Sequence, residues 1–311
     1  MKTTTEQYSW YKFARIVEGN LTVRQIVYAA IRAKKITIED LFILSAIEFQ
    51  EIFPQLGKGE FADFSQTHFQ IMNAAGWYKE FQNFRDDLKI VPVTSPFYPK
   101  KIKQRMGLAA PPILYCIGHL PLLNAKNISI IGSEEIGKKE ISLIWQLATY
   151  FARMGYNVTS THSAGVGEHA HKAALRVDGT TSAVLPNGLG GFDVRVFIRE
   201  YGWEYNSVFV SPFLPNKSTT TTAISRRNAL TAAWSDAIVV ITSDRNHDPT
   251  KMTSNAVEIG LTALTKNIPV FVPPAEQISF VSFGNVELEQ AGAIEFHRPK
   301  QIIDYLVTLK K

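Results

Sequence analysis

Two loops rich in glycine and small hydroxyl side chains are the parts of this sequence best suited to hold an anion. One follows a short apolar run at residues 128–131, and the other leads into a predicted helix that begins at Glu168. Glycine lets the backbone approach an anion closely, and the amides at a helix N-terminus carry partial positive charge. The pattern therefore predicts phosphate binding, although a strand-to-helix turn also needs glycine for steric reasons alone. The candidate residues are Gly132, Ser133, Ser160, Ser163, Gly165 and Gly167.

A pair of arginines followed by an asparagine provides a third candidate element. Arg226, Arg227 and Asn228 are expected just before or within the first turn of a helix at 225–234. Because cations are unfavourable at a helix N-terminus, this placement indicates either an anionic partner or a compensating acidic neighbour. Both interpretations stay open at the level of the sequence.

The predicted helix after the second loop adds two further candidates, His171 and Lys172. Lys172 would add positive charge for phosphate groups, as would Arg176. His171 is either a binding residue or a buried histidine whose ring bonds to a neighbouring loop. A metal site is not predicted, because His169 and His171 are two residues apart and point in different directions on a helix.

The sequence lacks the motifs of the common nucleotide-dependent enzymes. The loop at 131–137 is not the complete Gly-x-Gly-x-x-Gly fingerprint, and no glycine-rich loop ends in the Lys-Ser or Lys-Thr pair of a P-loop. The loop at 186–191 is only loosely similar to the motif of phosphoribohydrolases, and no nucleophile stands at a recognisable spacing from a base. We therefore expect no catalytic residues, no cofactor and no metal.

Short apolar runs alternate with amphipathic helical patterns from Asn127 onward. Uninterrupted apolar strands separated by helices indicate a parallel sheet covered on both faces. The predicted fold class is α/β, with a doubly wound, mostly parallel Rossmann-like sheet that binds ligands at the carboxyl ends of its strands. Strands are expected at 128–131, 157–159, 182–185, 208–210, 237–241 and 270–272. Helices are expected at 138–154, 168–177, 194–201, 225–234, 253–265 and 299–309.

A small helical domain precedes the sheet. Residues 20–90 carry apolar side chains at three- and four-residue spacing, and a short strand follows. The predicted organisation is a helical N-terminal domain over 1–90 and an extended Rossmann domain over 91–311. The proline-rich segment 96–112 is interpreted as a loop or linker, and 218–222 as a mobile loop.

The composition is that of an ordinary globular protein with a mild basic excess. The 311 residues are 45% hydrophobic and 20% charged, and the net charge of +5 favours phosphate-bearing partners without establishing one. Cys116 is the only cysteine, so no intramolecular disulfide forms. The first residues contain no apolar run of the kind found in a signal peptide or a membrane anchor. We expect a cytoplasmic protein without membrane association.

The motifs, taken in order, resemble the DprA/Smf family of DNA-processing proteins. Tyr-Pro at 98–99 and the Pro-Pro-x-Leu-Tyr-x-x-Gly pattern at 111–118 are similar to the lead-in of that family. Gly-Ser at 132–133 falls where the family has Gly-Ser-Arg. The stretch 165–175 resembles Gly-Ile-Asp-x-x-Ala-His-x-x-Ala-Leu, and Arg-Asn at 227–228 resembles Arg-Asn-Arg.

The resemblance implies an extended Rossmann domain that binds single-stranded DNA without strong sequence preference. It also implies a homodimer that delivers the strand to a RecA-type recombinase. Four positions depart from the family pattern: Glu134 and Ala229 replace arginines, Thr161 replaces a glycine, and Gly167 replaces an aspartate. Glu134 would repel a phosphate at the place where an arginine attracts one. The missing arginine at Ala229 predicts weaker binding than a typical member shows.

Two functions from different classes fit these residues. The leading hypothesis is a non-catalytic protein that binds single-stranded DNA, with phosphates in the loops of Gly132 and Gly165. The alternative is a sensor of nucleotides or nucleotide-derived signals, in which Glu134 hydrogen-bonds a ribose hydroxyl. Under either hypothesis, Ser133 and Ser163 should line one crevice together with the two glycines.

Overall fold

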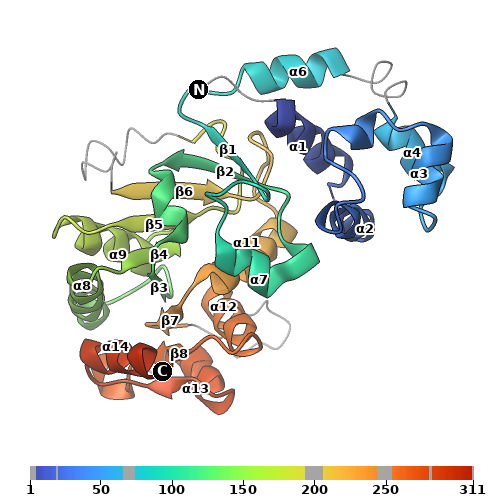
Figure 1. Ribbon diagram of the computed structural model, residues 1–311. Coiled ribbons are helices and arrows are strands. Elements are labelled where there is room, and N and C mark those ends of the chain that lie inside the picture. The colour runs from blue at the N-terminus through green and yellow to red at the C-terminus, as the bar shows by residue number, and fades with distance from the viewer. Residues whose placement is uncertain are drawn as a thin grey trace.

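One mixed sheet organises the molecule. The computed structural model describes residues 5–18, 20–65, 74–192, 206–243, 254–279 and 282–309. Within these residues, nine strands pair in the order β1-β2-β6-β5-β4-β3-β7-β8-β9 (Figure 1). β2 runs antiparallel to both of its neighbours, and the other neighbouring pairs are parallel. The strands are β1 (Lys89–Pro92), β2 (Ile113–Gly118), β3 (Asn127–Ile131), β4 (Asn157–Thr161), β5 (Thr181–Val184), β6 (Ser207–Ser211), β7 (Ala237–Val240), β8 (Val270–Val272) and β9 (Ile294–Glu295).

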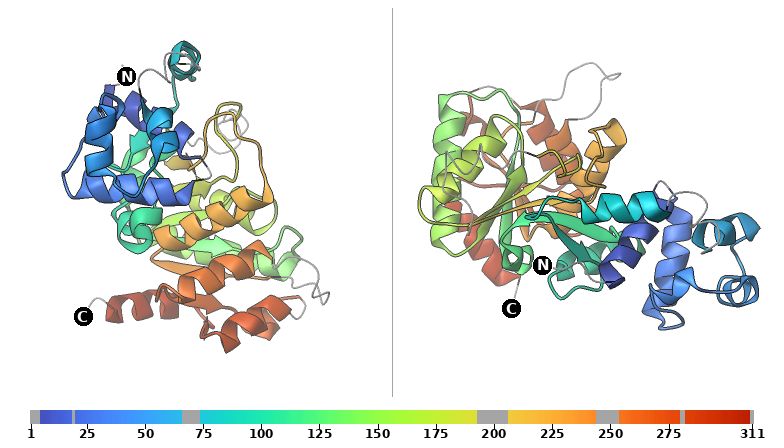
Figure 2. Two further views of the ribbon diagram at one scale, coloured as in Figure 1. Left: turned by 90° about the vertical axis from the view of Figure 1, so that its right-hand side faces the viewer. Right: turned by 90° about the horizontal axis from the view of Figure 1, so that it is seen from above.

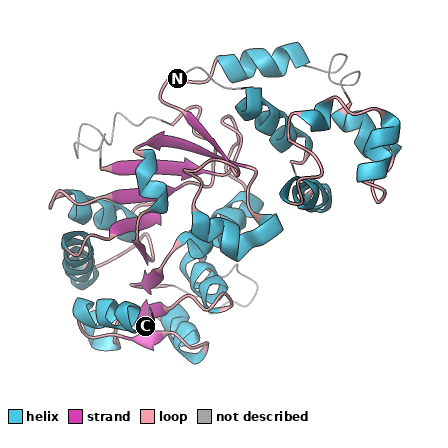
Figure 3. Ribbon diagram, in the orientation of Figure 1, coloured by secondary structure: helices cyan, strands magenta, loops and turns pink. Residues whose placement is uncertain are grey.

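Helices cover both faces of this sheet (Figure 3). Successive side chains of a strand point to opposite faces. Ile130 packs under α8 (Lys138–Arg153) and α9 (Val166–Leu175), whereas Ile131 packs under α12 (Asn255–Leu264) and α13 (Phe283–Gln290). The predicted α/β class, with a doubly wound and mostly parallel sheet, is confirmed. The covering helices are α7 (Lys100–Met106), α8 (Lys138–Arg153), α9 (Val166–Leu175), α11 (Thr221–Trp234), α12 (Asn255–Leu264), α13 (Phe283–Gln290) and α14 (Pro299–Thr308).

The helices that precede the sheet form a layer of their own, called here the helical unit (described residues 5–18, 20–65 and 74–82). Aromatic side chains such as Phe13, Phe49 and Phe64 fill its interior. The same hydrophobic cluster continues into one face of the sheet through Tyr115 and Phe209. The helical unit therefore covers the end of the sheet that the crossover helices leave open (Figure 2). Its helices are α1 (Thr5–Ile16), α2 (Leu21–Arg32), α3 (Ala46–Ile52), α4 (Lys58–Phe64) and α6 (Ala74–Gln82).

The helical pattern begins earlier than the expected residue 20. α1 starts at Thr5, and it buries Trp10, Tyr11 and Phe13 against the rest of the helical unit. Bulky aromatic residues, and not the aliphatic residues that usually mark an amphipathic helix, form its inner face. The helical pattern read over residues 20–90 therefore missed this first helix, which lies within the predicted helical domain 1–90.

The segment 96–112 is not a linker. It contains α7, which begins after Pro99 at the N-cap and ends at Gly107, whose φ of +54° takes the chain out of the helix. α7 lies between the helical unit and α11 (Figure 2). Its Lys101 forms an ion pair with Asp236 at 2.7 Å, so part of the basic charge of this segment is used within the fold.

The segment 218–222 is only partly a loop, because α11 begins at Thr221. The hydroxyl of Thr220 accepts a hydrogen bond from the Ala223 amide at 3.2 Å and caps the start of α11. The helix predicted at 194–201 lies outside the described residues. None of the helices in the described part of the chain has the length and apolar character needed to cross a membrane.

Candidate nucleic-acid interface

The two glycine-containing loops meet at the carboxyl ends of adjacent parallel strands. β3 and β4 pair in parallel, so the residues that follow them emerge at the same edge of the sheet. The Val166 amide donates a hydrogen bond to the Ser133 carbonyl at 3.2 Å. A Cβ atom added to Gly165 would lie 2.2 Å from the carbonyl oxygen of Glu134. The structure thus brings together Gly132, Ser133, Ser163 and Gly165.

Contact between the loops explains the glycine at position 165 before any ligand is considered. Gly165 has a φ of +67°, a conformation that residues with a Cβ rarely adopt, and the Glu134 backbone leaves no room for a side chain. Gly155 differs, since its φ of +76° is accompanied by open space. At Gly155 only the backbone conformation requires glycine, whereas at Gly165 both conformation and space require it.

Several polar groups of these loops already have partners inside the protein. In the first turn of α9, the amides of Val166 and Glu168 donate to the carbonyls of Ser133 and Ser163 at 3.2 and 3.0 Å. The buried hydroxyl of Ser160 donates to a β3 carbonyl at 2.6 Å. Because these donors are engaged, the loops offer an anion fewer free N–H groups than the sequence pattern suggests.

His171 and Gly167 lie beneath the loops, buried in α9. The Thr181 hydroxyl donates to the Val158 carbonyl at 2.6 Å, so it accepts a hydrogen bond from Nδ1 of His171, also at 2.6 Å. Burial lowers the pKa of His171 to about 3, and the ring is therefore neutral at pH 7. This placement favours the interpretation of His171 as a buried histidine that supports the sheet over a contact with phosphate.

Acidic residues offset the positive charge on this half of the edge. Lys172 forms an ion pair with Glu168 one turn away on α9. That hydrogen bond and charge lower the pKa of Glu168, so its carboxylate is ionised at neutral pH. Glu134 is exposed in the first loop and adds a further negative charge.

The arginine pair lies in the second turn of α11, not in the first turn or before the helix. Thr220 caps this helix, so residues 221–225 precede the two arginines within it. The expectation of cations at a helix N-terminus was wrong, because a run of threonines supplies the cap and the first turn. Arg226 is exposed, whereas Arg227 and Asn228 are buried.

Arg227 places a buried cation beside the carboxyl end of β5. Arg227 is only 5% exposed, and its Nε donates a hydrogen bond to Oδ1 of Asn228 at 2.8 Å. Its Nη1 lies 3.5 Å from the carbonyl of Val184, the last residue of β5. Burial lowers the pKa of Arg227 to about 10, which leaves it charged at neutral pH. In the described part of the chain, no carboxylate lies within ion-pair distance of this guanidinium, although the charge of Glu258 raises its pKa and so offsets part of the effect of burial.

Asn228 ties α11 to α12 and orients Arg227. Its Nδ2 donates to Oε2 of Glu258 at 2.7 Å and to Oδ1 of Asn255 at 3.1 Å, while its Oδ1 receives the Arg227 bond. Sequence reasoning missed Glu258 and Asn255, because no local pattern connects α12 with a residue 30 positions earlier. The buried amide therefore supports the arginine and is itself fully engaged.

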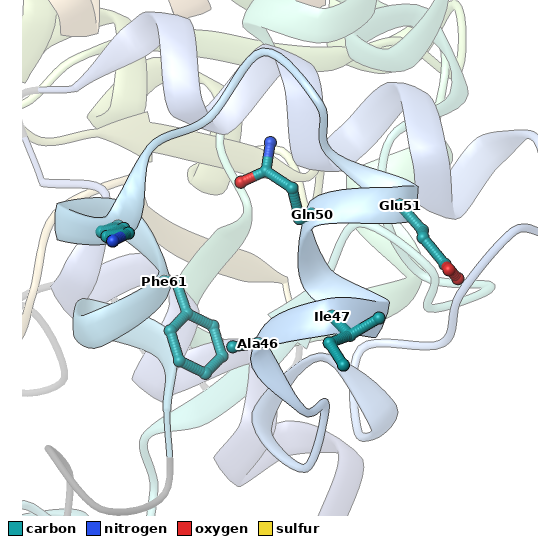
Figure 4. A pocket seen from close by; sticks show the side chains of 6 residues that line it. Ala46, Ile47, Gln50, Glu51 and Phe61 are labelled. Carbon is teal, nitrogen blue, oxygen red and sulfur yellow. The ribbon is translucent and has the colours of Figure 1, made fainter.

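A cavity of about 450 Å³ lies elsewhere, between α3 and α4 of the helical unit (Figure 4). Its wall is mainly apolar, with the ring of Phe61 facing Ala46 and with Ile47 at the rim. Among the described residues, no group of three or more His, Cys, Asp or Glu side chains is arranged to hold a metal ion. The edge of the sheet that holds the loops and Arg227 remains the candidate interface.

Comparison with known proteins identifies the family. A sequence model of DNA recombination-mediator protein A matches residues 89–307. The chain belongs to this family. The Smf protein of Escherichia coli is 27% identical over 222 residues, which are 70% of this chain and 56% of that protein. The chain thus spans little more than half the length of that DprA/Smf relative, and the resemblance drawn from its motifs is confirmed.

Solved structures of DprA proteins share this fold. The X-ray structure of DprA from Streptococcus pneumoniae matches with a TM-score of 0.73, at 22% identity and with 98% of each chain covered. A structure of DprA from Helicobacter pylori, described for its mode of binding single-stranded DNA, matches with a TM-score of 0.59 and 22% identity. It covers 73% of this chain and 97% of that chain. The DprA fold of this chain therefore includes the N-terminal helical part.

Proposed function

We propose that this member of the DprA family binds single-stranded DNA without catalysing a reaction, as a mediator of recombination. The structural observation that carries the proposal is Arg227, a buried cation without a carboxylate partner among the described residues. Glu258 raises the pKa of Arg227 from beyond ion-pair distance, so its charge offsets that of the guanidinium only in part. A buried cation without a direct ion pair is unfavourable, and a phosphate at the carboxyl edge of the sheet would pair with it directly. The mode of DNA binding described for the H. pylori relative supports the same ligand.

Charge for this ligand comes from α11 more than from the glycine-containing loops. Arg226 is exposed one residue before Arg227, so the same turn can meet a second phosphate group. Guanidinium groups bind phosphate oxygens through two parallel hydrogen bonds, which favours arginine at such a position. Gly132, Ser133, Ser163 and Gly165 would then shape the floor of the interface, with Glu134 weakening it.

The finer parts of the function rest on the family alone. We propose that the chain acts in the cytoplasm as a homodimer and passes its DNA to a RecA-type recombinase. No contact in the described residues bears on either partner. Sedimentation of the purified protein would test the dimer, and a strand-exchange assay with a recombinase would test the transfer.

The experiment for DNA binding is fluorescence anisotropy with labelled oligonucleotides of several sequences over a series of salt concentrations. We expect affinities that differ little between sequences, because phosphates carry no base identity. The logarithm of the affinity should fall linearly with the logarithm of the salt concentration, with a slope of about 0.7 per phosphate contacted.

Two controls separate this function from its alternative. Unlabelled mononucleotides should compete only weakly, since each offers one phosphate and no chain. Absence of oligonucleotide binding at low salt would contradict the proposal. Tight binding of a mononucleotide in that case would favour the nucleotide sensor.

A further inference from the structure

His162 lies at the carboxyl end of β4, directly after Thr161, in the loop that leads to Gly165. Its side chain is exposed, and the centroid of its ring lies 5.3 Å from that of Phe192 and 6.0 Å from that of Phe209. The ring stands nearly perpendicular to both phenylalanine rings. Edge-to-face contacts of this kind are favourable and hold an aromatic ring in one orientation. The candidate interface therefore contains an exposed aromatic ring whose orientation is fixed.

The two phenylalanines that support this ring are themselves held in place. Phe209 is only 2% exposed in β6, and the centroid of its ring lies 4.9 Å from that of Phe192. The Phe192 amide donates to the Leu189 carbonyl at 3.2 Å, and the Phe192 carbonyl accepts a hydrogen bond from Nη1 of Arg85, which precedes β1. A ring that is ordered before a ligand arrives loses little conformational entropy when it binds one.

His162 and Arg227 approach the same place from opposite faces of the sheet. The last residues of β4 and β5 are partners in the parallel register, so the residues that follow them emerge side by side. Arg227 reaches the carbonyl of Val184, the last residue of β5, from α11. His162 contacts Phe209, which alternates along β6 with Val210, a residue packed beneath α11. A DNA strand that crosses this edge can therefore place a phosphate on the α11 side and a base on the side of His162.

The chemistry of the ring suits a base more than a phosphate. Proteins that bind single strands stack bases on aromatic side chains, histidine among them. Packing removes part of the ring from water and lowers the pKa of His162, an effect that the charge of Glu168 opposes. The ring is therefore neutral at pH 7. Contact with a base through a neutral ring would add affinity that depends little on salt.

We propose that His162 provides a stacking surface for one base of the single-stranded DNA whose phosphate lies near Arg227. The inference rests on the proposed function, because it concerns the same ligand. It adds a base contact to an interface otherwise built from charged groups and glycine-containing loops. Every base has an aromatic face, so this contact is compatible with binding that shows little sequence preference.

The test compares His162→Ala and His162→Phe with the unaltered protein in the anisotropy assay over a salt series at pH 7. Two labelled strands are used: an ordinary oligonucleotide and a strand of equal length whose sugars carry no bases. His162→Ala should bind the ordinary oligonucleotide about tenfold more weakly at every salt concentration, as expected for one lost stacked base. Its salt slope should not change, since no phosphate contact is lost. His162→Phe keeps an aromatic ring and should keep most of the affinity.

The strand without bases isolates the contribution of stacking. It offers the same phosphates, so the unaltered protein should bind it more weakly than the ordinary oligonucleotide. His162→Ala should bind it as tightly as the unaltered protein does. The matched control is His297→Ala, which removes an exposed histidine beyond β9, at the far end of the sheet. This control should leave the affinity for both strands unchanged.

The outcomes distinguish the inference from the function on which it rests. Unchanged affinity of His162→Ala for the ordinary oligonucleotide, with normal binding by the unaltered protein, would overturn the inference and leave the proposed function in place. A salt slope lowered by about 0.7 in both variants would also overturn it, since it would indicate a phosphate contact. The unaltered protein provides a test that needs no variant, because equal affinity for the two strands would exclude a base contact. Absence of oligonucleotide binding by the unaltered protein would overturn both.

Discussion

The two halves of the candidate interface use their polar groups differently. At the ends of β3 and β4, amides such as that of Val166 donate to carbonyls of the same loops, and Lys172 is paired with Glu168. On α11, Arg227 is buried without a carboxylate partner in the described residues, and Arg226 is exposed. Glycines and hydroxyls in the first half serve contacts between loops, whereas the cations of the second half form no ion pair within the described residues and suit the anionic ligand proposed above.

Gly165→Ala gives the largest expected effect, and it tests whether the first half is held together by backbone contact. A Cβ there would combine a φ of +67° with a distance of 2.2 Å to the Glu134 carbonyl. The positive φ costs about 1 to 2 kcal/mol and overpacking costs about 1 to 3 kcal/mol. We expect a loss of about 3 kcal/mol in the free energy of unfolding, measured by urea denaturation.

Gly155→Ala is the matched control for that prediction. It has a similar φ of +76° but no atom within 4 Å of the added Cβ. Its expected loss is about 1 kcal/mol, the conformational cost alone. Equal losses in the two variants would show that contact between the loops is not what requires glycine at position 165.

Arg227→Met tests the second half of the comparison. The substitution keeps most of the buried volume and removes the charge, so oligonucleotide affinity should fall by about ten- to a hundredfold. Stability should change by about 1 kcal/mol or less, because only the bond to Asn228 is lost at full strength. A fall of about 3 to 5 kcal/mol with unchanged DNA binding would instead show a buried ion pair and would contradict the proposed role.

His171→Asn separates stability from binding in the first half. The pKa of His171 is lowered to about 3 in the folded chain, so the unfolded chain binds the extra proton as the pH falls below about 6.5. The unaltered protein should therefore lose about 1.4 kcal/mol of stability per pH unit from this group between those values, with the full contribution present above pH 6.5.

The measurement is urea denaturation of both proteins at pH 7 and pH 5.5. The unaltered protein should lose about 1.4 kcal/mol more than the variant over that interval. Parallel losses would mean that the His171 ring is not kept neutral by burial. DNA binding of the variant at pH 7 should stay close to normal, because the ring bonds to Thr181 inside the fold.

The sequence was sufficient to locate the parallel core of the sheet and the edge that carries the loops, but not the antiparallel strand β2 or the short strand β9. β8 lies at the expected residues 270–272, and β3 begins one residue before the expected start, since runs of β-branched and apolar residues mark buried strands. The start of α11 was misplaced by four residues, because threonines are common in loops and also serve as helix caps. Aromatic patterning similarly concealed α1.

The sequence could not predict which polar groups at the interface form hydrogen bonds with one another. The Val166 amide donates to the Ser133 carbonyl, and the Asn228 amide donates to Glu258. Both hydrogen bonds depend on how separate loops and helices pack together. The resemblance to the DprA/Smf family pointed to the Arg-Asn motif, and the structure adds that Arg227 is buried. A pattern can propose a ligand for a residue, but only the tertiary contacts show which donors remain available for it.

Lys172→Ala gives the smallest expected effect and sharpens the contrast with Arg226. Glu168 already neutralises Lys172, so the substitution removes a cation and leaves a carboxylate without its partner. An exposed pair at this spacing contributes only about 0.2 to 0.5 kcal/mol to the stability of the helix. The salt slope for oligonucleotide binding should change by much less than the 0.7 expected for one lost phosphate. A slope change as large as that of Arg226→Ala would place a phosphate on α9 and would show that the two halves contribute equally. Glu168→Gln provides the complementary measurement: it releases Lys172 from its partner and should strengthen binding slightly at low salt, an effect that added salt removes.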